Sequence, residues 1–194
     1  MMSALILGLL MFLGMHSARI LAEGWRTQVI TQRGPNAWKG LYTAVSLIGF
    51  GLIVWGYGQA RQAPAVLWAS PLWTRHTAAL LMLVALVLLV ATYVPGNGIK
   101  ARLHHPMLLS VKVWALAHLL ANNTVADVLL FGSFLLWAVL DFRSARQRDR
   151  AAGTVYPPGK PAATAVTVVV GAALWAVLAF WAHAWLFGVR PFGG

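Results

Sequence analysis

Apolar residues along the chain gather into six stretches, at about 2–22, 40–58, 77–94, 107–121, 124–141 and 164–188. All 9 prolines and most of the charged residues lie outside these stretches. Long apolar runs are typical of membrane-spanning helices, which need roughly 20 residues to cross the hydrocarbon core. The pattern therefore predicts an all-α fold, a polytopic membrane helical bundle of about six segments, with residues 1–194 forming a single integral membrane domain.

Only Asn122, Asn123 and Thr124 separate the fourth stretch from the fifth. The two stretches form either a short hairpin or one long helix, and the positive charges favour the hairpin. With a hairpin, twelve of the 15 lysines and arginines lie on one side of the membrane, and the other side keeps Arg61, Arg75 and Arg190. Because cytoplasmic loops carry the excess of positive charge, both termini are expected in the periplasm of a multi-pass protein of the bacterial inner membrane.

Composition supports a membrane location and narrows the chemistry. The chain is 60% hydrophobic and 10% charged, with a mean hydropathy of +0.72, which lies outside the range of soluble domains. Its formal charge is +11, but the basic residues sit between apolar runs, so membrane lipid rather than nucleic acid is the expected partner. Without cysteine, the chain cannot form disulfides, thiolate metal sites or a covalently attached c-type haem.

Three histidines fall inside apolar stretches, and two of them, His16 and His118, are the main candidates for chemistry. Arg19 follows His16 by three residues and Glu23 follows Arg19 by four, on one stripe of a continuous first helix, and His118 precedes Asn122. One interpretation is structural: Arg19 pairs with Glu23, and His118 joins a cap-like network with Asn122. The other is that the two imidazoles hold a haem iron from its two sides.

Other polar residues have simpler interpretations. Asp127 suits the N-terminus of the fifth helix and is expected to cap it together with Thr124. His105 is interpreted as an interfacial residue before Pro106, which starts the fourth helix. His183 ends a stripe of small residues on the sixth helix and ranks third as a haem ligand.

The segments "LGLLMFLGMHSARILAEGWR" and "HHPMLLSVKVWALAHLLANNTVADVLLFGSFLLWAVLDFRSARQR" resemble the NnrU family of bacterial membrane proteins, and the resemblance covers essentially the whole chain. That family is named for an association with denitrification genes and is similar to zeta-carotene isomerase, a b-type haem membrane enzyme. The resemblance implies haem b as cofactor, with His16 in "GMHSAR" and His118 in "WALAH" as the iron ligands. Ala115 stands where the isomerase has a cysteine, so ligand exchange with sulfur is not available to this chain.

The resemblance also implies a function for the haem. We expect a redox-dependent isomerase or oxidoreductase acting on a lipid-soluble substrate, or a factor that supports denitrification. With His16 as ligand and the haem propionates directed to the cytoplasm, Arg19 lies one turn beyond the histidine. Arg26 follows two turns later on nearly the same face, so both arginines are expected to bind the propionates.

A second resemblance gives an alternative function. The segment "RLHHPMLLSVKVWALAH" is similar to the hairpin entry of isoprenylcysteine-type membrane methyltransferases, which bind S-adenosylmethionine. Those enzymes have arginine before the His-Pro pair and two glutamates after the hairpin. This chain has His104 before His105 and a single Asp141. The alternative is therefore an S-adenosylmethionine-dependent membrane methyltransferase.

Overall fold

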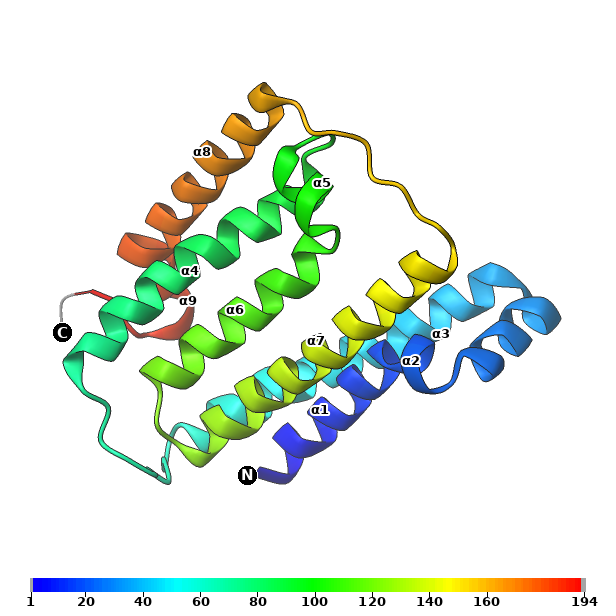
Figure 1. Ribbon diagram of the computed structural model, residues 1–194. Coiled ribbons are helices and arrows are strands. Elements are labelled where there is room, and N and C mark those ends of the chain that lie inside the picture. The colour runs from blue at the N-terminus through cyan, green and yellow to red at the C-terminus, as the bar shows by residue number, and fades with distance from the viewer. Residues whose placement is uncertain (1, 193–194) are drawn as a thin grey trace. The chain divides into compact units, whose positions relative to one another are not determined.

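The computed structural model describes residues 2–192, and the described chain is helical with no β-strand (Figure 1). The helices group into two compact units, each built from two segments that are separated in the sequence. The first unit is Met1–Trp68 with Asn123–Asp141, and the second is Ala69–Asn122 with Phe142–Gly194.

The first unit consists of α1 (Met2–His16), α2 (Ala18–Leu21), α3 (Glu23–Ala60) and the first part of α7 (Val125–Ala151). Helix α1 lies alongside α3 (Figure 1), and glycines allow the close approach. A Cβ atom on Gly8 would lie 2.8 Å from the carbonyl oxygen of Gly49, and one on Gly56 would lie 2.8 Å from the Cα atom of Leu5. Small residues that let helix backbones touch are a common means of helix association in membranes.

The predicted first helix over residues 2–22 is wrong in its extent. Helix α1 ends at His16, Ser17 forms a turn, and Ala22 (φ −139°, ψ 40°) separates α2 from α3. A further break occurs at Gly34, whose φ of 81° suits glycine and whose successor Pro35 restarts the helix. These breaks reverse the chain so that α3 can pack antiparallel to α1, an arrangement that a continuous apolar pattern does not reveal.

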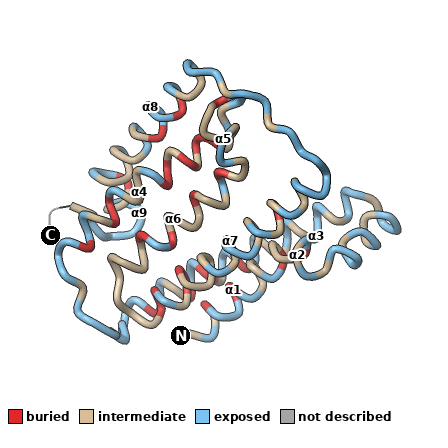
Figure 2. Tube along the Cα trace, in the orientation of Figure 1, coloured by how far each residue is buried: buried red, intermediate tan, exposed pale blue. Residues whose placement is uncertain are grey.

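The second unit contains α4 (Leu72–Tyr93), α5 (Gly98–Leu103), α6 (Pro106–Ala121), the end of α7, α8 (Pro161–Val177), a π-helical turn η1 (Leu178–Ala182) and α9 (His183–Phe187). Helix α4 packs against α6 and α8. Buried residues recur along the length of α4 (Figure 2). The hydroxyl of Ser110 donates to the carbonyl of Ala85 (2.7 Å), and the indole of Trp175 donates to that of Ala79 (2.9 Å). Side-chain donors that cannot reach water are thus satisfied by the backbone of the neighbouring helix.

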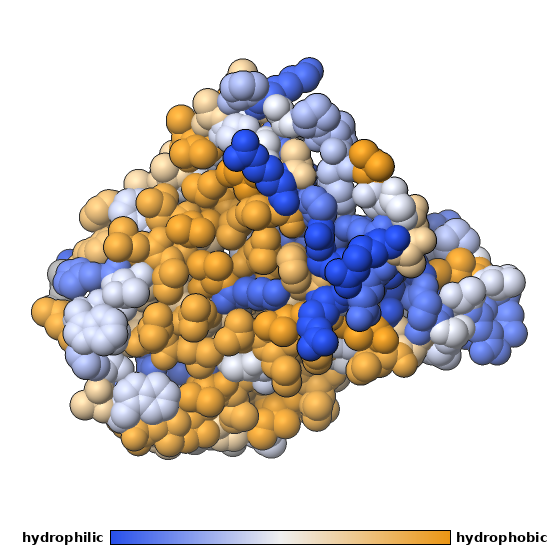
Figure 3. All heavy atoms as spheres, viewed as in Figure 1, coloured by the Kyte–Doolittle hydropathy of each residue, from blue (hydrophilic) through white to orange (hydrophobic). Residues whose placement is uncertain are grey.

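Four helices are long and apolar enough to cross a membrane: Glu23–Ala60, Leu72–Tyr93, Val125–Ala151 and Pro161–Phe187. Two shorter apolar helices, α1 and α6, have 15 and 16 residues. Large apolar side chains are exposed on these helices, among them Leu10, Leu47 and Val169 at 65–67% of their surface, and the face seen in Figure 3 is mostly hydrophobic. The predicted class, an all-α membrane helical bundle, is confirmed.

The short connection between the fourth and fifth apolar segments is also confirmed, because α6 ends at Ala121 and α7 begins at Val125. The amide of Asn122 donates to the carbonyl of His118 (3.0 Å) and closes the end of α6. The amide of Asn123 donates to the carbonyl of Trp68 (2.6 Å), so both asparagines satisfy backbone carbonyls at the connection.

Candidate functional site

His16 is the last residue of α1, and its own helix fixes its ring. The Nδ1 atom lies 2.7 Å from the carbonyl oxygen of Phe12, one turn earlier. Because a carbonyl can only accept a hydrogen bond, Nδ1 must carry the proton and Nε2 keeps its lone pair. An imidazole that donates through one nitrogen and offers the other is the usual arrangement of a histidine that ligates a metal.

Aromatic rings from α1, α3 and α7 surround His16. Its ring stacks on Phe12, with centroids 4.1 Å apart and planes within 24°. Tyr42 of α3 lies 5.0 Å from it, and Trp137 of α7 meets it edge-on at 5.9 Å. Aromatic rings therefore form much of the surroundings of His16, and the Asp141 carboxylate is close enough to interact with it electrostatically.

Two buried polar atoms in the first unit have no hydrogen-bond partner among the described residues, the Trp137 indole nitrogen and the Ser46 hydroxyl. Trp137 contacts His16, and Ser46 lies one helical turn beyond Tyr42 on α3. Buried donors without a partner are rare and costly, especially where no water can reach them. The indole nitrogen of Trp137 is thus a buried donor beside His16 without a hydrogen-bond partner among the described residues.

His118, in the second unit, repeats the local arrangement of His16. Its Nδ1 atom lies 2.9 Å from the carbonyl oxygen of Trp114, again one turn earlier, and the Trp114 ring lies 5.3 Å from the imidazole. Nδ1 therefore carries the proton here as well. The predicted network with Asn122 exists, but it runs through the backbone carbonyl of His118 rather than through its ring.

The charged residues after His16 are arranged differently from the sequence-based interpretation. Glu23 pairs with Arg26 at 2.9 Å, not with Arg19, and the Arg26 guanidinium also lies 5.8 Å from the centre of the Trp38 ring. Arg19 is exposed and forms no ion pair within the described residues. Because the helix is interrupted at Ser17 and Ala22, His16, Arg19 and Glu23 do not share one helical stripe.

The predicted cap of the fifth apolar segment is confirmed. Asp127 accepts hydrogen bonds from the backbone N–H (2.9 Å) and the hydroxyl (2.6 Å) of Thr124, and the Tyr57 hydroxyl donates to its other oxygen (2.5 Å). The carboxylate is 5% exposed and fully engaged. It therefore stabilises the start of α7 against α3 and offers no free group for chemistry.

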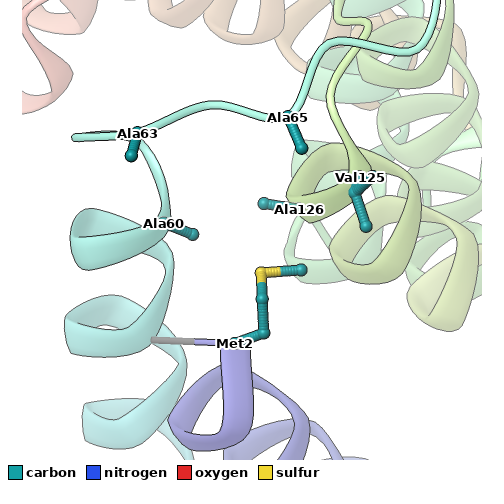
Figure 4. Close-up of a pocket in the computed structure, with 6 residues that line it drawn as sticks. All are labelled: Met2, Ala60, Ala63, Ala65, Val125 and Ala126. Atoms are coloured by element: carbon teal, nitrogen blue, oxygen red, sulfur yellow. The ribbon is translucent and has the colours of Figure 1, made fainter.

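A small apolar pocket of about 120 Å³ lies near this cap, lined by Met2, Ala60, Ala63, Ala65, Val125 and Ala126. The Met2 side chain extends into it between Ala60 and Ala126 (Figure 4). It adjoins the start of α1, whereas His16 ends that helix about 21 Å away at 1.5 Å per residue. The pocket is therefore separate from the surroundings of His16.

A third group of side chains lies in the second unit, where α6 begins and α7 ends. His105 precedes Pro106 at the start of α6, as predicted, and its Nε2 atom lies 2.8 Å from the Asp149 carboxylate. The Tyr156 hydroxyl donates to the same carboxylate oxygen (2.9 Å). Burial, and then the hydrogen bond to Asp149 and its negative charge, raise the pKa of the Tyr156 phenol above its usual value. His105 thus has a structural partner in Asp149.

Sequence reasoning did not find the groups around His16. Trp137 and Phe12 look like ordinary packing residues in an apolar pattern, and Ser46 is an isolated hydroxyl. Only Phe12 carried a usable signal, because a residue four positions before a histidine in a helix lies under its ring. Within residues 2–192, no group of three or more His, Asp or Glu side chains could hold a bare metal ion.

The fold and the site together define a helical membrane protein in which histidines are held against aromatic rings on apolar helices. The chain belongs to the NnrU family: the family model described as NnrU protein matches residues 4–191, nearly its whole length. The family expected from the sequence is therefore confirmed. No curated protein and no solved structure matches the chain.

Proposed function

We propose that this protein binds a b-type haem, with His16 as one axial ligand and His118 as the second candidate. The observation that carries the proposal is the environment of His16: a ring with Nδ1 held by a carbonyl, aromatic neighbours, and the unpartnered donor of Trp137 beside it. His118 is argued separately, from the same Nδ1 arrangement in its own unit. The two histidines are also the ones that the resemblance to zeta-carotene isomerase points to.

A bound haem supplies one-electron redox chemistry, which polypeptide side chains alone do not provide. The residues of this chain would hold the iron through imidazole nitrogen and enclose the macrocycle with Phe12, Tyr42 and Trp137. Large apolar side chains are exposed on the helices, where they would contact the bilayer in which a lipid-soluble substrate dissolves. We therefore infer a redox-dependent isomerase or oxidoreductase, or a haem protein that supports denitrification.

The proposal is tested by the absorption spectrum of detergent-purified protein. The wild-type protein is expected to show a low-spin b-type haem spectrum, because two imidazoles complete the coordination of the iron. His16→Ala and His118→Ala should each abolish the haem bands or convert them to a high-spin form. His76→Ala is the control, because this histidine is exposed near the start of α4 and has no proposed role in binding the haem.

If both His16→Ala and His118→Ala keep the wild-type spectrum, the ligand assignment is wrong. If the wild-type protein carries no haem after expression with added haem precursor, the haem proposal itself fails. The S-adenosylmethionine alternative would then be the next to test, by binding of that cofactor to the same preparation.

The same proposal includes the orientation predicted from charge. Twelve lysines and arginines on one side against three on the other support an inner-membrane protein with both termini in the periplasm. A reporter fused after Gly194 that is active only in the cytoplasm would contradict this orientation.

A further inference from the structure

The group of side chains at the start of α6 and the end of α7 has features that the haem proposal does not use. It lies entirely within the second unit and includes His104 before α6, Arg146 near the end of α7 and Tyr156 in the connection to α8. The His104 ring stacks on Tyr156, with centroids 4.1 Å apart and planes within 14°. The Arg146 guanidinium contacts Nδ1 of the same imidazole.

His104 has a strained backbone. Its φ of 71° and ψ of −59° place it in a region that L-residues rarely adopt, and it is the one non-glycine residue with positive φ in the described chain. The N–H of His105 donates to the carbonyl of Leu103 (3.0 Å) across it, which is the hydrogen bond of a γ-turn. Strain of this kind persists only when surrounding contacts enforce it, and it concentrates at ligand-binding sites.

His104 and Arg146 leave N–H donors available in this arrangement. A guanidinium can only donate, so Nδ1 of His104 accepts from Arg146 and its Nε2 must carry the proton. Arg146 has further N–H groups, and it forms no ion pair within residues 2–192. The Tyr156 ring stacks on the imidazole, and its hydroxyl donates a hydrogen bond to Asp149.

The charge balance favours an anion at this place. Asp149 is the only acidic side chain in the second unit. One oxygen of its carboxylate accepts from His105 and Tyr156, and the charge of Arg146 also acts on it. Nearby, the Lys112 ammonium lies 3.9 Å from the centre of the Phe142 ring instead of beside a carboxylate. The cations of this region therefore outnumber the acidic groups that could neutralise them.

We propose that His104 and Arg146 form a binding site for a phosphate-type oxyanion. A planar guanidinium beside a fixed imidazole N–H matches the several acceptor oxygens of a phosphate group better than it matches a spherical anion. The same chemistry is offered by the headgroup of an anionic phospholipid and by soluble phosphate. The site does not depend on haem binding.

The test compares thermal unfolding of the full-length protein, followed by the fluorescence of its tryptophans, in nanodiscs of phosphatidylcholine. Sodium phosphate is titrated against sodium chloride at equal ionic strength, because a ligand that binds the folded state raises the unfolding temperature. In a second arm, nanodiscs containing phosphatidylglycerol replace the zwitterionic ones without added phosphate. Stabilisation by soluble phosphate identifies a soluble oxyanion, and stabilisation by phosphatidylglycerol alone identifies a lipid headgroup.

Arg146→Gln should weaken the apparent affinity about 10-fold or more, since it removes a charge-assisted, forked contact. Arg150→Gln is the matched control: it removes the same charge one turn further along α7, from an exposed position, and should change the affinity by less than about 2-fold. His104→Phe keeps the ring against Tyr156 but deletes the Nε2 donor, so it should also weaken binding. This variant decides the question if Arg146→Gln does not fold.

Two results would overturn the proposal. One is that neither phosphate nor phosphatidylglycerol stabilises the wild-type protein beyond the ionic-strength control. The other is that Arg146→Gln and Arg150→Gln lose the same affinity, which would make the effect one of net charge only.

Discussion

His16 and His104 have similar aromatic surroundings but opposite hydrogen-bond partners at the ring nitrogen Nδ1. Each ring stacks on an aromatic neighbour at 4.1 Å, Phe12 for the first and Tyr156 for the second. The difference lies at Nδ1, which faces a carbonyl in His16 and a guanidinium in His104. An acceptor at Nδ1 leaves Nε2 with a lone pair, and a donor at Nδ1 leaves Nε2 with a proton. The partner of one nitrogen thus decides whether the other suits a metal or an anion.

The backbone conformations of His16 and His104 also differ. His16 belongs to a regular helix whose own carbonyl orients the ring, so the arrangement requires little beyond local sequence. His104 sits at positive φ and is held there by side chains from α7 and from the connection to α8. The ring of His16 is thus oriented locally and only its neighbours depend on helix packing, whereas the conformation of His104 depends on a network of polar contacts. The two sites should therefore respond to different substitutions.

The largest expected effect comes from Gly56, where α3 touches α1. In Gly56→Ala the new Cβ would lie 2.8 Å from the Cα atom of Leu5, so the helices must separate. We expect a loss of about 1–3 kcal/mol in the free energy of unfolding and weaker haem retention through His16. Unfolding in detergent and the haem absorbance measure the two effects.

Gly58→Ala is the control for that substitution, because a Cβ there meets nothing within 4 Å. Alanine favours a helix over glycine by about 1 kcal/mol, so this variant should be unchanged or slightly more stable. Equal destabilisation by both variants would mean that the α1–α3 contact does not depend on glycine. Neither variant should alter phosphate binding at Arg146.

The sequence predicted the elements well and the sites only in part. The apolar stretches predicted most of the long helices and the break at Asn122 to Thr124. The positions of Thr124 and Asp127 predicted the cap. Each of these features depends on residues close in the chain. The sequence did not reveal the break in the helix at Ser17, because the apolar pattern continues across that residue. The partner of Glu23 was also missed: a charge three positions after it is as close as one four positions before it, and helix continuity decides between them.

The neighbours of His16 were beyond sequence reasoning for a different reason. Tyr42 and Trp137 come from helices far apart in the chain, and nothing in a run of apolar residues says which tryptophan faces a histidine. The strain at His104 was equally hidden, because "LHHP" contains no glycine to mark a positive φ. Both features depend on tertiary contacts that override local preference.

A smaller effect is expected from substitutions in the charged segment that follows His16. These substitutions test whether that segment contacts the haem propionates. We predict that Arg19→Gln weakens haem retention about 10-fold, because an exposed guanidinium without an ion-pair partner in the described chain is available to a propionate. Glu23→Gln breaks a solvent-exposed pair with Arg26, so stability should fall by less than about 1 kcal/mol. Haem retention should be unchanged or slightly better once Arg26 is released.

Haem transfer to apomyoglobin measures retention in these variants, and Arg33→Gln is the control for net charge in the same basic segment. If Arg19→Gln and Arg33→Gln behave alike, Arg19 does not contact a propionate. Arg26, whose guanidinium lies 5.8 Å from the centre of the Trp38 ring, would then be the next residue to substitute.

The smallest effect should come from Tyr156→Phe, which separates the two roles of that ring. The substitution keeps the stacking on His104 and removes the hydrogen bond to Asp149, so phosphate affinity should be retained while stability falls by about 1 kcal/mol near pH 7.

Because the folded pKa of Tyr156 is raised, the unfolded chain releases the phenolic proton first as the pH rises. The stability advantage of the wild-type protein is therefore full below about pH 10 and declines as the pH rises through the folded pKa. Unfolding of both proteins between pH 7 and alkaline pH measures the difference, with Tyr93→Phe, at an exposed phenol on α4, as the control. A difference that stays constant across this range would mean that the phenol–carboxylate bond does not stabilise the fold.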